Sequence, residues 1–461
     1  MSDAEQPSNG LERRLGLFPL TNIVVANMVG AGIFTTSGLL MKDLGNAWLM
    51  LALWVAGGAI ALCGALCYGE LGAAMPQAGG EYVFLSRLFH PLFGFLSGWV
   101  SFFVGFSAPI AASAIGFAEY ITRAFPWLLG LGLFSGPEAA SILKKAYAAL
   151  IIIVFTLVHR RGVKLGARVQ NVLTLMKVGL ILGLILFGLS SDKGSFSHLS
   201  QGGAVDFGFD GWKIMGLALM WIMFAYSGWN ASAYVGSEVR NPAKTLPRSL
   251  LLGTGAVILL YVLLNLFYIY AVPPSDMAGV ISIGGLAARN LFGSGVENTV
   301  SGLIAVALFS SLSAFIILGP RVYYAMAKDG LFFKFAAEVH PRFRVPSKAI
   351  LLQGAMALLI AVSGSFDQIL TYMGFALGIF PIMAVIGLFK LRRGKRSVVK
   401  MPGFPVTAAV YVLAGAAILC LGFLRSPVPS SIALLTACLG VPAFFVFRNR
   451  RPAPNPSSEP S

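Results

Sequence analysis

The sequence predicts an all-α integral membrane protein with about twelve transmembrane helices. Apolar residues make up 57% of the 461 residues and charged residues only 11%, whereas soluble domains carry about 25% charge. Apolar runs of about 20 residues recur from end to end, and each is long enough to cross a hydrocarbon layer about 30 Å thick. This composition excludes a soluble domain, a disordered chain, a disulfide scaffold and a secreted enzyme.

Twelve apolar segments are the candidate spans. They cover residues 18–41, 47–72, 91–122, 140–159, 166–190, 212–236, 248–272, 297–326, 348–364, 367–390, 404–424 and 429–447. With the N-terminus in the cytoplasm, 25 of the 34 Lys and Arg fall on the inner side and 8 on the outer side. This asymmetry follows the positive-inside rule, so the net charge of +16 needs no nucleic-acid partner. We expect a multi-pass protein of the cell inner (plasma) membrane.

Both termini are expected in the cytoplasm, as a tail of residues 1–17 and a tail of residues 448–461. No cleavable signal peptide is expected, because the first span is too long for a signal core and has no small-residue cleavage site.

Glycines cluster in the middle of the first span, where the chain reads Asn27 to Phe34 with Gly30 and Gly32 flanking Ala31. One interpretation is close helix packing through small residues. The other is an unwound break. Free N–H groups at the start of a half-helix there would bind an anion such as a carboxylate, and the carbonyls of Met28 and Val29 would suit an ammonium group.

The sixth span repeats this feature in the segment Phe224 to Asn230, where Ser227 and Gly228 lie between aromatic residues. Alone, this segment could also be a packing site. The two segments, however, are each the first span of a set of five. Glycine-interrupted spans at matching places in two halves are the best sequence indication of a transporter's binding site, so the pair favours a functional interpretation.

Lys177 lies about 11 residues into the fifth span, which is ~16 Å along a helix. Ionisable side chains at such depth are costly and usually mark ion or proton pathways. Its ammonium could stand in the place of a sodium ion and hold the broken first helix, or it could load and release a proton. A static ammonium bound by carbonyls is the third possibility. Glu70 and Glu119, near span ends, are expected to be interfacial or solvated carboxylates.

Enzyme signatures are missing, and neither a cofactor nor a metal site is expected. The four histidines lie in loops or at span edges without ligand spacing, and no nucleophile elbow or phosphate loop occurs. Cys63 and Cys67 share one helix face, but they are expected to be packing residues.

Several motifs together resemble the amino acid–polyamine–organocation superfamily, and within it bacterial relatives of the L-type amino acid transporters. The resemblance covers roughly residues 16–450. The matching segments are Val29–Phe34, Gly69–Leu71 with Met75–Tyr82, Phe224–Asn230, and Gly236–Pro242 with Leu246–Arg248.

This resemblance implies a LeuT-type architecture: a first inverted repeat over 18–190 (helices 1–5), a second over 212–390 (helices 6–10), and two further helices over 404–447, with helices 1 and 6 broken. It implies that the substrate carboxylate meets N–H groups near Ala31 and Gly32, and that the amino group meets carbonyls near Met28, Val29 and Phe224. Phe224 would be the aromatic gate. The full set of expected substrate-binding residues is Met28, Val29, Gly30, Ala31, Gly32, Phe224, Ser227, Gly228, Trp229 and Asn230.

By the same resemblance, Lys177 aligns with a fifth-helix lysine that replaces sodium in sodium-independent members. Ser310, Ser311 and Ser313 fall where the eighth helix approaches the first. The outer loop 123–140 lacks the cysteine that joins mammalian L-type members to a heavy chain, so no disulfide-linked partner is expected. The middle of the third span, Ser101 to Ala112, has no acid, and the sixth-span break has Ser227 rather than an acid, so a neutral amino acid is favoured.

The sequence thus predicts a sodium-independent transporter of neutral L-amino acids that works by alternating access, most simply as an exchanger. Proton-coupled symport is an alternative, because Lys177 fits both. A non-transporting amino acid sensor that kept the fold is the alternative from another class.

Overall fold

The computed structural model describes residues 13, 15–77, 79–131, 137–161, 167–343 and 345–449. Most of the predicted tails 1–17 and 448–461 lie outside these residues, as do Ala78 of the second motif and the start of the predicted fifth span at residue 166. The described residues form helices joined by short connections, and their β-structure is limited to two isolated bridges, Leu15 with Val239 and Asn46 with Gly202.

The α-helices follow the predicted spans closely. They are α1 (Leu17–Met28), α2 (Ala31–Leu44), α3 (Ala47–Ala74), α4 (Glu81–Leu88), α5 (Pro91–Val100), α6 (Ala108–Ala124), α7 (Pro137–Arg160), α8 (Ala167–Leu189), α9 (Phe209–Ala225), α10 (Pro242–Ala271), α11 (Pro274–Met277), α12 (Ile283–Phe292), α13 (Ser294–Lys328), α14 (Ser347–Ser363), α15 (Phe366–Arg393), α16 (Val406–Arg425) and α17 (Pro427–Asn449). A π-helix, η1 (Ser101–Ser107), joins α5 to α6. Short 3-10 helices are η2 (Pro126–Leu131), η3 (Phe196–Ser200), η4 (Ala231–Glu238) and η5 (Lys334–Ala337).

Ten described segments are long and apolar enough to cross a membrane. They are Leu17–Leu44, Ala47–Ala74, Pro91–Ala124, Glu138–Arg160, Val172–Leu189, Pro242–Ala271, Ser294–Lys328, Phe366–Arg393, Val406–Arg425 and Pro427–Asn449. The apolar helix α14 is shorter, with 17 residues. The predicted sixth span is divided in the structure, because α9 ends at Ala225 and the chain continues through turns into η4. The prediction of an all-α membrane protein is confirmed.

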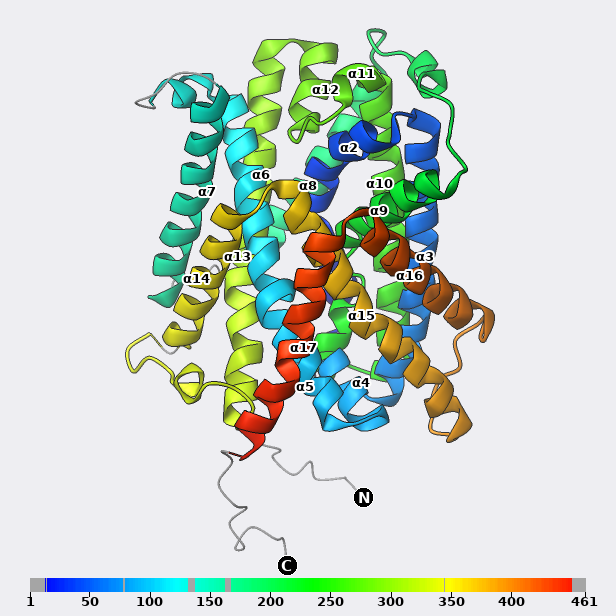
Figure 1. Ribbon diagram of the computed structural model, residues 1–461, viewed down its shortest axis with the longest axis vertical. Coiled ribbons are helices and arrows are strands. Elements are labelled where there is room, and N and C mark those ends of the chain that lie inside the picture. The colour runs from blue at the N-terminus through cyan, green and yellow to red at the C-terminus, as the bar shows by residue number, and fades with distance from the viewer. Residues whose placement is uncertain are drawn as a thin grey trace, which may run out of the picture.

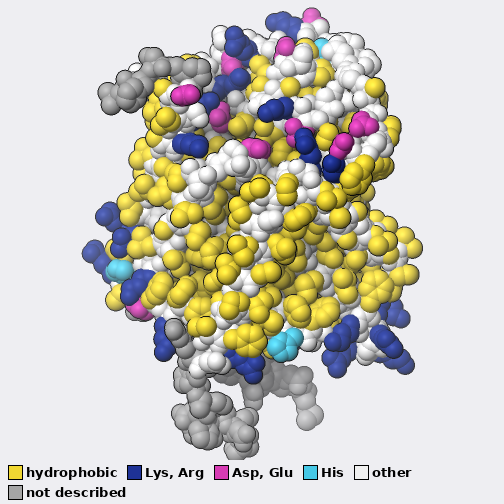
Figure 2. All heavy atoms as spheres, viewed as in Figure 1, with side chains coloured by type: hydrophobic (Ala, Val, Ile, Leu, Met, Phe, Trp, Pro, Cys, Tyr) yellow, Lys and Arg dark blue, Asp and Glu magenta, His cyan; other side chains and the backbone are white. Residues whose placement is uncertain are grey.

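The long helices run roughly between two ends of the molecule (Figure 1). We call them the α12 end, at the top of Figure 1 with α11 and α12, and the α4 end, at the bottom with α4 and the last turns of α17. On the face seen in Figure 2, apolar side chains cover the middle, Lys and Arg lie along the lower rim and also near the α12 end, and acidic side chains lie mainly near the α12 end. Such an apolar belt between polar ends suits a bilayer.

The outer helix faces explain why this belt is apolar. Leu175 and Phe187 on α8 are each 73% exposed and Leu413 on α16 is 69% exposed, although they lie in the middle of apolar helices. In water such exposure would be unfavourable, whereas in lipid it costs nothing. The interior is tightly packed around α9 and the α1–α2 junction, where many side chains are fully buried.

Candidate functional site

The helix of the first span is interrupted at the predicted glycines. Val29 and Gly30 are extended, with φ/ψ of −72°/94° and −145°/−152°, between the end of α1 and the start of α2. The hydroxyl of Tyr261 on α10 donates a hydrogen bond of 2.6 Å to the carbonyl of Met28. At the other side of the interruption, the first N–H groups of α2 have no acceptor inside the helix. The junction therefore offers carbonyls and N–H groups within a few residues.

Lys177 joins α8 to this junction. Its side chain is buried, with 1% of the residue exposed. The ammonium donates to Ser311 Oγ of α13 at 2.7 Å and to the carbonyl oxygen of Val29 at 3.4 Å. Among the described residues no carboxylate pairs with it. Lys177 thus holds together the interrupted first span, α8 and α13.

The three predicted serines of α13 separate in the structure. Ser311 binds Lys177, whereas Ser313 Oγ lies 2.9 Å from His159 Nε2 on α7. Ser310 is fully buried, and its hydroxyl has no hydrogen-bond partner in the described part of the chain. Each helical residue is turned by about 100° from the last, so serines two positions apart face different neighbours. Only Ser311 belongs to the Lys177 contact.

The second interruption is a compact turn rather than an extended stretch. After α9, the N–H of Tyr226 donates to the carbonyl of Ile222 at 2.9 Å and the N–H of Ser227 to that of Phe224 at 2.8 Å. Gly228 has a φ of +97°, a conformation that favours glycine. The local hydrogen bonds therefore satisfy the end of α9 within the turn itself.

The two interruptions lie against each other. A Cβ atom on Gly228 would stand 2.8 Å from the carbonyl carbon of Asn27, and one on Gly32 would stand 2.4 Å from the Cα of Ala225. Glycine is required at both places, because any larger residue would push α9 away from α1 and α2. The structure thus brings the predicted residues Met28 to Gly32 next to Phe224, Ser227 and Gly228.

A cluster of aromatic rings connects the two interruptions. The ring of Trp54 packs edge to face against Tyr226 and Tyr261, and the two tyrosine rings are tilted to each other, with centroids 5.2 to 5.7 Å apart. Tyr226 belongs to the second interruption and Tyr261 binds the first, so the cluster couples them mechanically. Sequence reasoning did not single out Tyr261, because an aromatic residue inside an apolar span carries no distinctive pattern.

The last two predicted pocket residues face away from the first interruption. The ring of Trp229 packs edge-on against Tyr68 of α3, at 4.8 Å, and Tyr411 of α16, at 5.8 Å. The amide of Asn230 donates to the carboxylate of Glu81 at 2.5 Å. Glu81 stands in the motif Met75–Tyr82, but it was not predicted as a site residue. The motif itself was the available signal.

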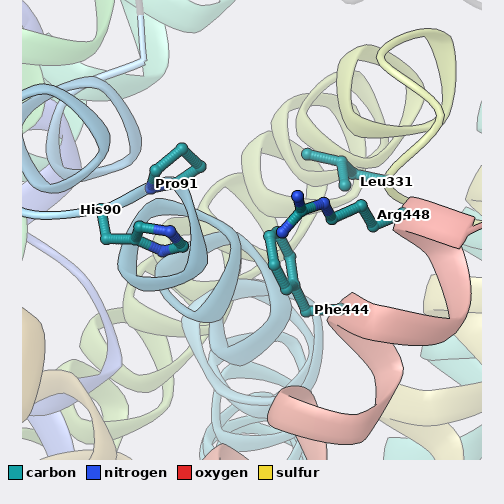
Figure 3. Close-up of a pocket in the computed structure, with 5 residues that line it drawn as sticks. All are labelled: His90, Pro91, Leu331, Phe444 and Arg448. Carbon is teal, nitrogen blue, oxygen red and sulfur yellow. The ribbon is translucent and has the colours of Figure 1, made fainter.

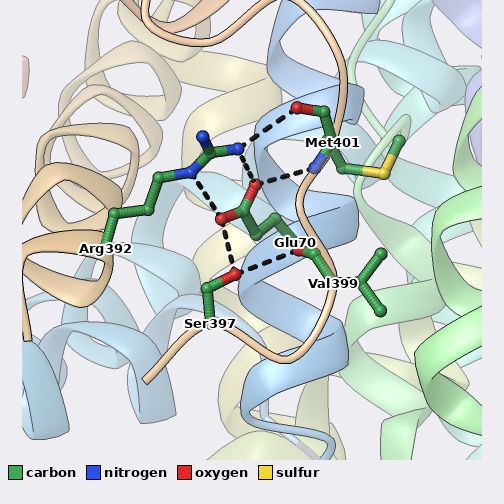
Figure 4. A network of polar contacts seen from close by, with 5 residues as sticks. All are labelled: Glu70, Arg392, Ser397, Val399 and Met401. Atoms are coloured by element: carbon green, nitrogen blue, oxygen red, sulfur yellow. Dashed lines mark hydrogen bonds and ion pairs between the residues drawn. The ribbon is translucent and has the colours of Figure 1, made fainter. Parts of the chain in front are cut away.

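Glu70, expected as an interfacial or solvated carboxylate, lies near the α4 end. Its side chain is fully buried rather than solvated, because Arg392 of α15 donates to both carboxylate oxygens, at 2.7 and 2.5 Å. Ser397 Oγ and the N–H of Met401 complete the network at 2.7 and 3.0 Å (Figure 4). The partners are more than 300 residues away in sequence, so no local pattern pointed to them. Glu119 is partly exposed and pairs with Lys144 at 2.7 Å.

A cavity of about 250 Å³ also opens at the α4 end. It is lined by His90, Pro91, Leu331, Phe444 and Arg448, and the side chains of His90, just before α5, and Arg448, on α17, reach toward it (Figure 3). None of the predicted site residues contributes to it. Its position separates it from the two interruptions.

The amino-acid sequence is similar to those of known transport proteins over nearly its whole length. Residues 15–444 match the family model described as amino acid permease. The chain is 28% identical to the serine/threonine exchanger SteT of Bacillus subtilis, over 96% of this chain and 98% of that protein. It is also 28% identical to the mouse large neutral amino acids transporter small subunit 2, over 96% and 83%, and to the mouse b(0,+)-type amino acid transporter 1, over 87% and 81%.

Proposed function

The chain belongs to the amino acid permease family, and on that premise we propose that it is a sodium-independent exchanger of neutral L-amino acids. As a member of this family of transporters it is a multi-pass membrane protein that transports amino acids, and it is not an enzyme. The coupling mode, the substrate class and the orientation are what we propose beyond family membership.

The proposed architecture has twelve spans: an inverted repeat over 18–190 and 212–390, followed by the helices of 404–447. The interruptions after α1 and α9 then occupy the first span of each repeat, as broken helices 1 and 6. The α4 end and both termini face the cytoplasm of the inner (plasma) membrane. The excess of Lys and Arg on the inner side in the sequence, 25 against 8, supports this orientation.

One observation carries the proposal of sodium independence: the ammonium of Lys177 binds the carbonyl of Val29 and the hydroxyl of Ser311. Carbonyl and hydroxyl oxygens are ligands that hard cations use in proteins. Here the cation is a covalent part of the chain, and it already connects the interrupted first span to α13. A bound sodium ion would therefore be redundant at this place.

We assign the amino acid to the region where the two interruptions meet. The N–H groups of Ala31 and Gly32 would bind the carboxylate at the start of α2, where the helix dipole favours negative charge. The carbonyls of Val29 and Phe224 would bind the amino group, with Met28 and Gly30 shaping the backbone. Phe224 would be the gate, and Ser227, Gly228, Trp229 and Asn230 would border the pocket or the second interruption.

Small neutral side chains suit this site best. The close contacts at Gly32 and Gly228 leave little volume where the two interruptions meet, and Ser227 adds no charge there. The ammonium of Lys177 is already bound. Because one relative is a serine/threonine exchanger, serine and threonine are the first substrates to test. The four cysteines lie in α3, α16 and α17, so we propose that no disulfide-linked heavy chain is needed.

Proton-coupled symport is the second candidate. The observation that favours it is that Lys177 has no carboxylate partner in the described structure, so its neutral form would leave no buried charge uncompensated. Exchange is preferred because no movement of Lys177 is then required.

Uptake of radiolabelled serine into proteoliposomes tests the proposal. Vesicles are run empty, preloaded with unlabelled serine, with an imposed pH gradient, and with sodium replaced by potassium. We expect rapid uptake only after preloading, unchanged without sodium and without the pH gradient. Uptake into empty vesicles driven by protons would establish the symporter instead, and a requirement for sodium would contradict the role given to Lys177. Binding of serine without flux would support a sensor.

A further inference from the structure

Glu81, the first residue of α4, carries a buried carboxylate that no role above explains. The residue is 4% exposed. Its Oε1 accepts hydrogen bonds from the hydroxyl of Tyr68 at 2.8 Å and from the amide of Asn230 at 2.5 Å, and its Oε2 accepts one from the hydroxyl of Tyr234. Within the described residues no Lys, Arg or His forms an ion pair with it.

The donors come from two sides. Tyr68 belongs to α3, whereas Asn230 and Tyr234 belong to the turn and the 3-10 helix η4 that follow the second interruption. The backbone repeats the connection, because the N–H of Gly79 donates to the carbonyl of Tyr234 at 3.1 Å. Gly80 is also fitted to the Tyr234 ring, which lies 2.7 Å from where a Cβ of Gly80 would stand. The loop that precedes α4 therefore packs closely against η4 around the carboxylate of Glu81.

Moving η4 would leave this carboxylate poorly solvated. An ionised group that loses its partners in a buried place is strongly unfavourable, and hydrogen bonds to a carboxylate are stronger than neutral ones. If η4 leaves, only Tyr68 remains as a donor. Water must then enter at the α4 end to replace Asn230 and Tyr234.

The start of the chain is attached to the same segment. The N–H of Leu15 donates to the carbonyl of Glu238 at 2.8 Å, and the N–H of Arg240 donates to that of Leu15 at 2.9 Å. The segment before α1 and the end of η4 thus form a pair, and η4 itself follows the second interruption. A displacement of η4 from α3 and α4 would therefore also disturb its pairing with the segment before α1.

We propose that Glu81 is a positioning residue for transport: through Asn230 and Tyr234 it holds η4 against α3 and α4, and it so keeps the α4 end of the substrate path closed. This inference rests on the proposed transport function. Glu81 contacts the proposed site at its border, through Asn230. It acts through η4, and it sets how readily the path closes after each opening.

Thiol labelling measures the closure without any flux. Cys63, Cys67, Cys420 and Cys438 are replaced by Ala, and Ala233→Cys places one thiol on η4 at a residue that is 2% exposed. We expect Glu81→Gln to speed alkylation of this thiol about tenfold, because a buried acceptor of three hydrogen bonds is replaced by a group that accepts fewer. Glu119→Gln is the matched control, since it makes the same chemical change at a partly exposed ion pair, and it should leave the rate unchanged.

The same variants are then assayed for serine exchange. Glu81→Gln should lower the maximal rate about tenfold while KM changes far less, because closure and not binding is impaired. A general loss of packing would instead raise KM as well. Glu81→Asp, which keeps the charge, should recover part of the rate.

Tyr234→Phe keeps the test decisive if Glu81→Gln does not fold. It removes one donor and should change both measurements in the same direction but less, and it should add nothing in a Glu81→Gln background, as expected for one network. Equal labelling in wild type, Glu81→Gln and Tyr234→Phe would overturn the inference, and so would equal acceleration by Glu119→Gln. Labelling that responds in a protein without flux would reject the transport function and leave the closure by Glu81 standing.

Discussion

The two interruptions of this molecule are stabilised in opposite ways. The first, between α1 and α2, is extended, and its carbonyls are bound from outside by the Lys177 ammonium and the Tyr261 hydroxyl. The second, after α9, is a turn whose backbone hydrogen bonds close within it. There the polar side chains make the long-range contact, by donating to the carboxylate of Glu81. One interruption depends on a buried cation and the other on a buried anion.

This difference shows what each interruption can do. An extended break leaves backbone groups free for a ligand, but it needs donors from neighbouring helices to keep its shape. A closed turn offers fewer free backbone groups, and it can move as a unit when its side-chain contacts are released. We therefore associate the first interruption with binding and the second with gating, and the predictions below test that division.

The largest effect is expected for Lys177→Met. This change keeps the length and the apolar stem of the side chain but removes the donor, and it leaves the Val29 carbonyl and the Ser311 hydroxyl without their partner. At ~1–3 kcal/mol for each unsatisfied buried group, serine exchange should fall about a hundredfold. Lys144→Met, at a partly exposed ion pair with Glu119, is the control and should retain nearly full exchange. A rate of serine exchange in Lys177→Met close to that of wild type would mean that the first interruption functions without this cation.

Glycine substitutions separate the two interruptions by shape. Gly228→Ala should lower stability by about 2–3 kcal/mol, because φ is +97° and the new Cβ would lie 2.8 Å from Asn27. Gly30→Ala should fold nearly as well as wild type, since the closest atom outside its neighbours is 3.7 Å away. Thermal unfolding in detergent compares them. Equal melting temperatures for the two variants would mean that the second turn is not as tightly packed as its contacts indicate.

The sequence predicted the helical membrane class, because apolar length is a local signal, and its clustered glycines singled out the two segments at which α1 and α9 end. It also placed Lys177 deep in a span. It could not distinguish the extended break from the closed turn, since both read as small residues between apolar ones. That distinction depends on which hydrogen bonds the folded backbone makes.

Long-range partners were the other part that could not be predicted. Tyr261 looks like any aromatic residue of an apolar helix until α10 is placed beside Met28. Glu70 was expected to be an interfacial or solvated carboxylate, because no local pattern points to its partner Arg392, which is 322 residues away. Ser311 and Ser313 looked equivalent in the sequence, and only the packing of α13 between α7 and α8 gives them different partners.

A smaller effect is expected for Tyr261→Phe. The Met28 carbonyl lies at a helix end, so it has no second donor in α1 when the hydroxyl is removed. KM for serine should rise about tenfold, the cost of one unsatisfied buried acceptor. Tyr226→Phe is the matched variant. It removes the hydrogen bond to the Trp54 carbonyl, but this carbonyl lies inside α3 and still accepts within the helix. Its KM should stay within about twofold of wild type, and an equal rise in both variants would assign the effect to the aromatic cluster instead.

The smallest expected difference separates the two serines of α13. Ser311→Ala removes the shorter of the two contacts of Lys177, at 2.7 Å, and leaves the 3.4 Å contact to Val29, so exchange should fall about fivefold, less than for loss of the ammonium itself. Ser313→Ala removes a contact with His159 on the far side of α13, and exchange should change by less than about twofold. The measurement is the initial rate of serine exchange at saturating substrate in both variants. A larger loss in Ser313→Ala would show that the contact of α13 with His159 of α7 also supports the first interruption. Binding would then depend on α7 as well as on α8 and α10.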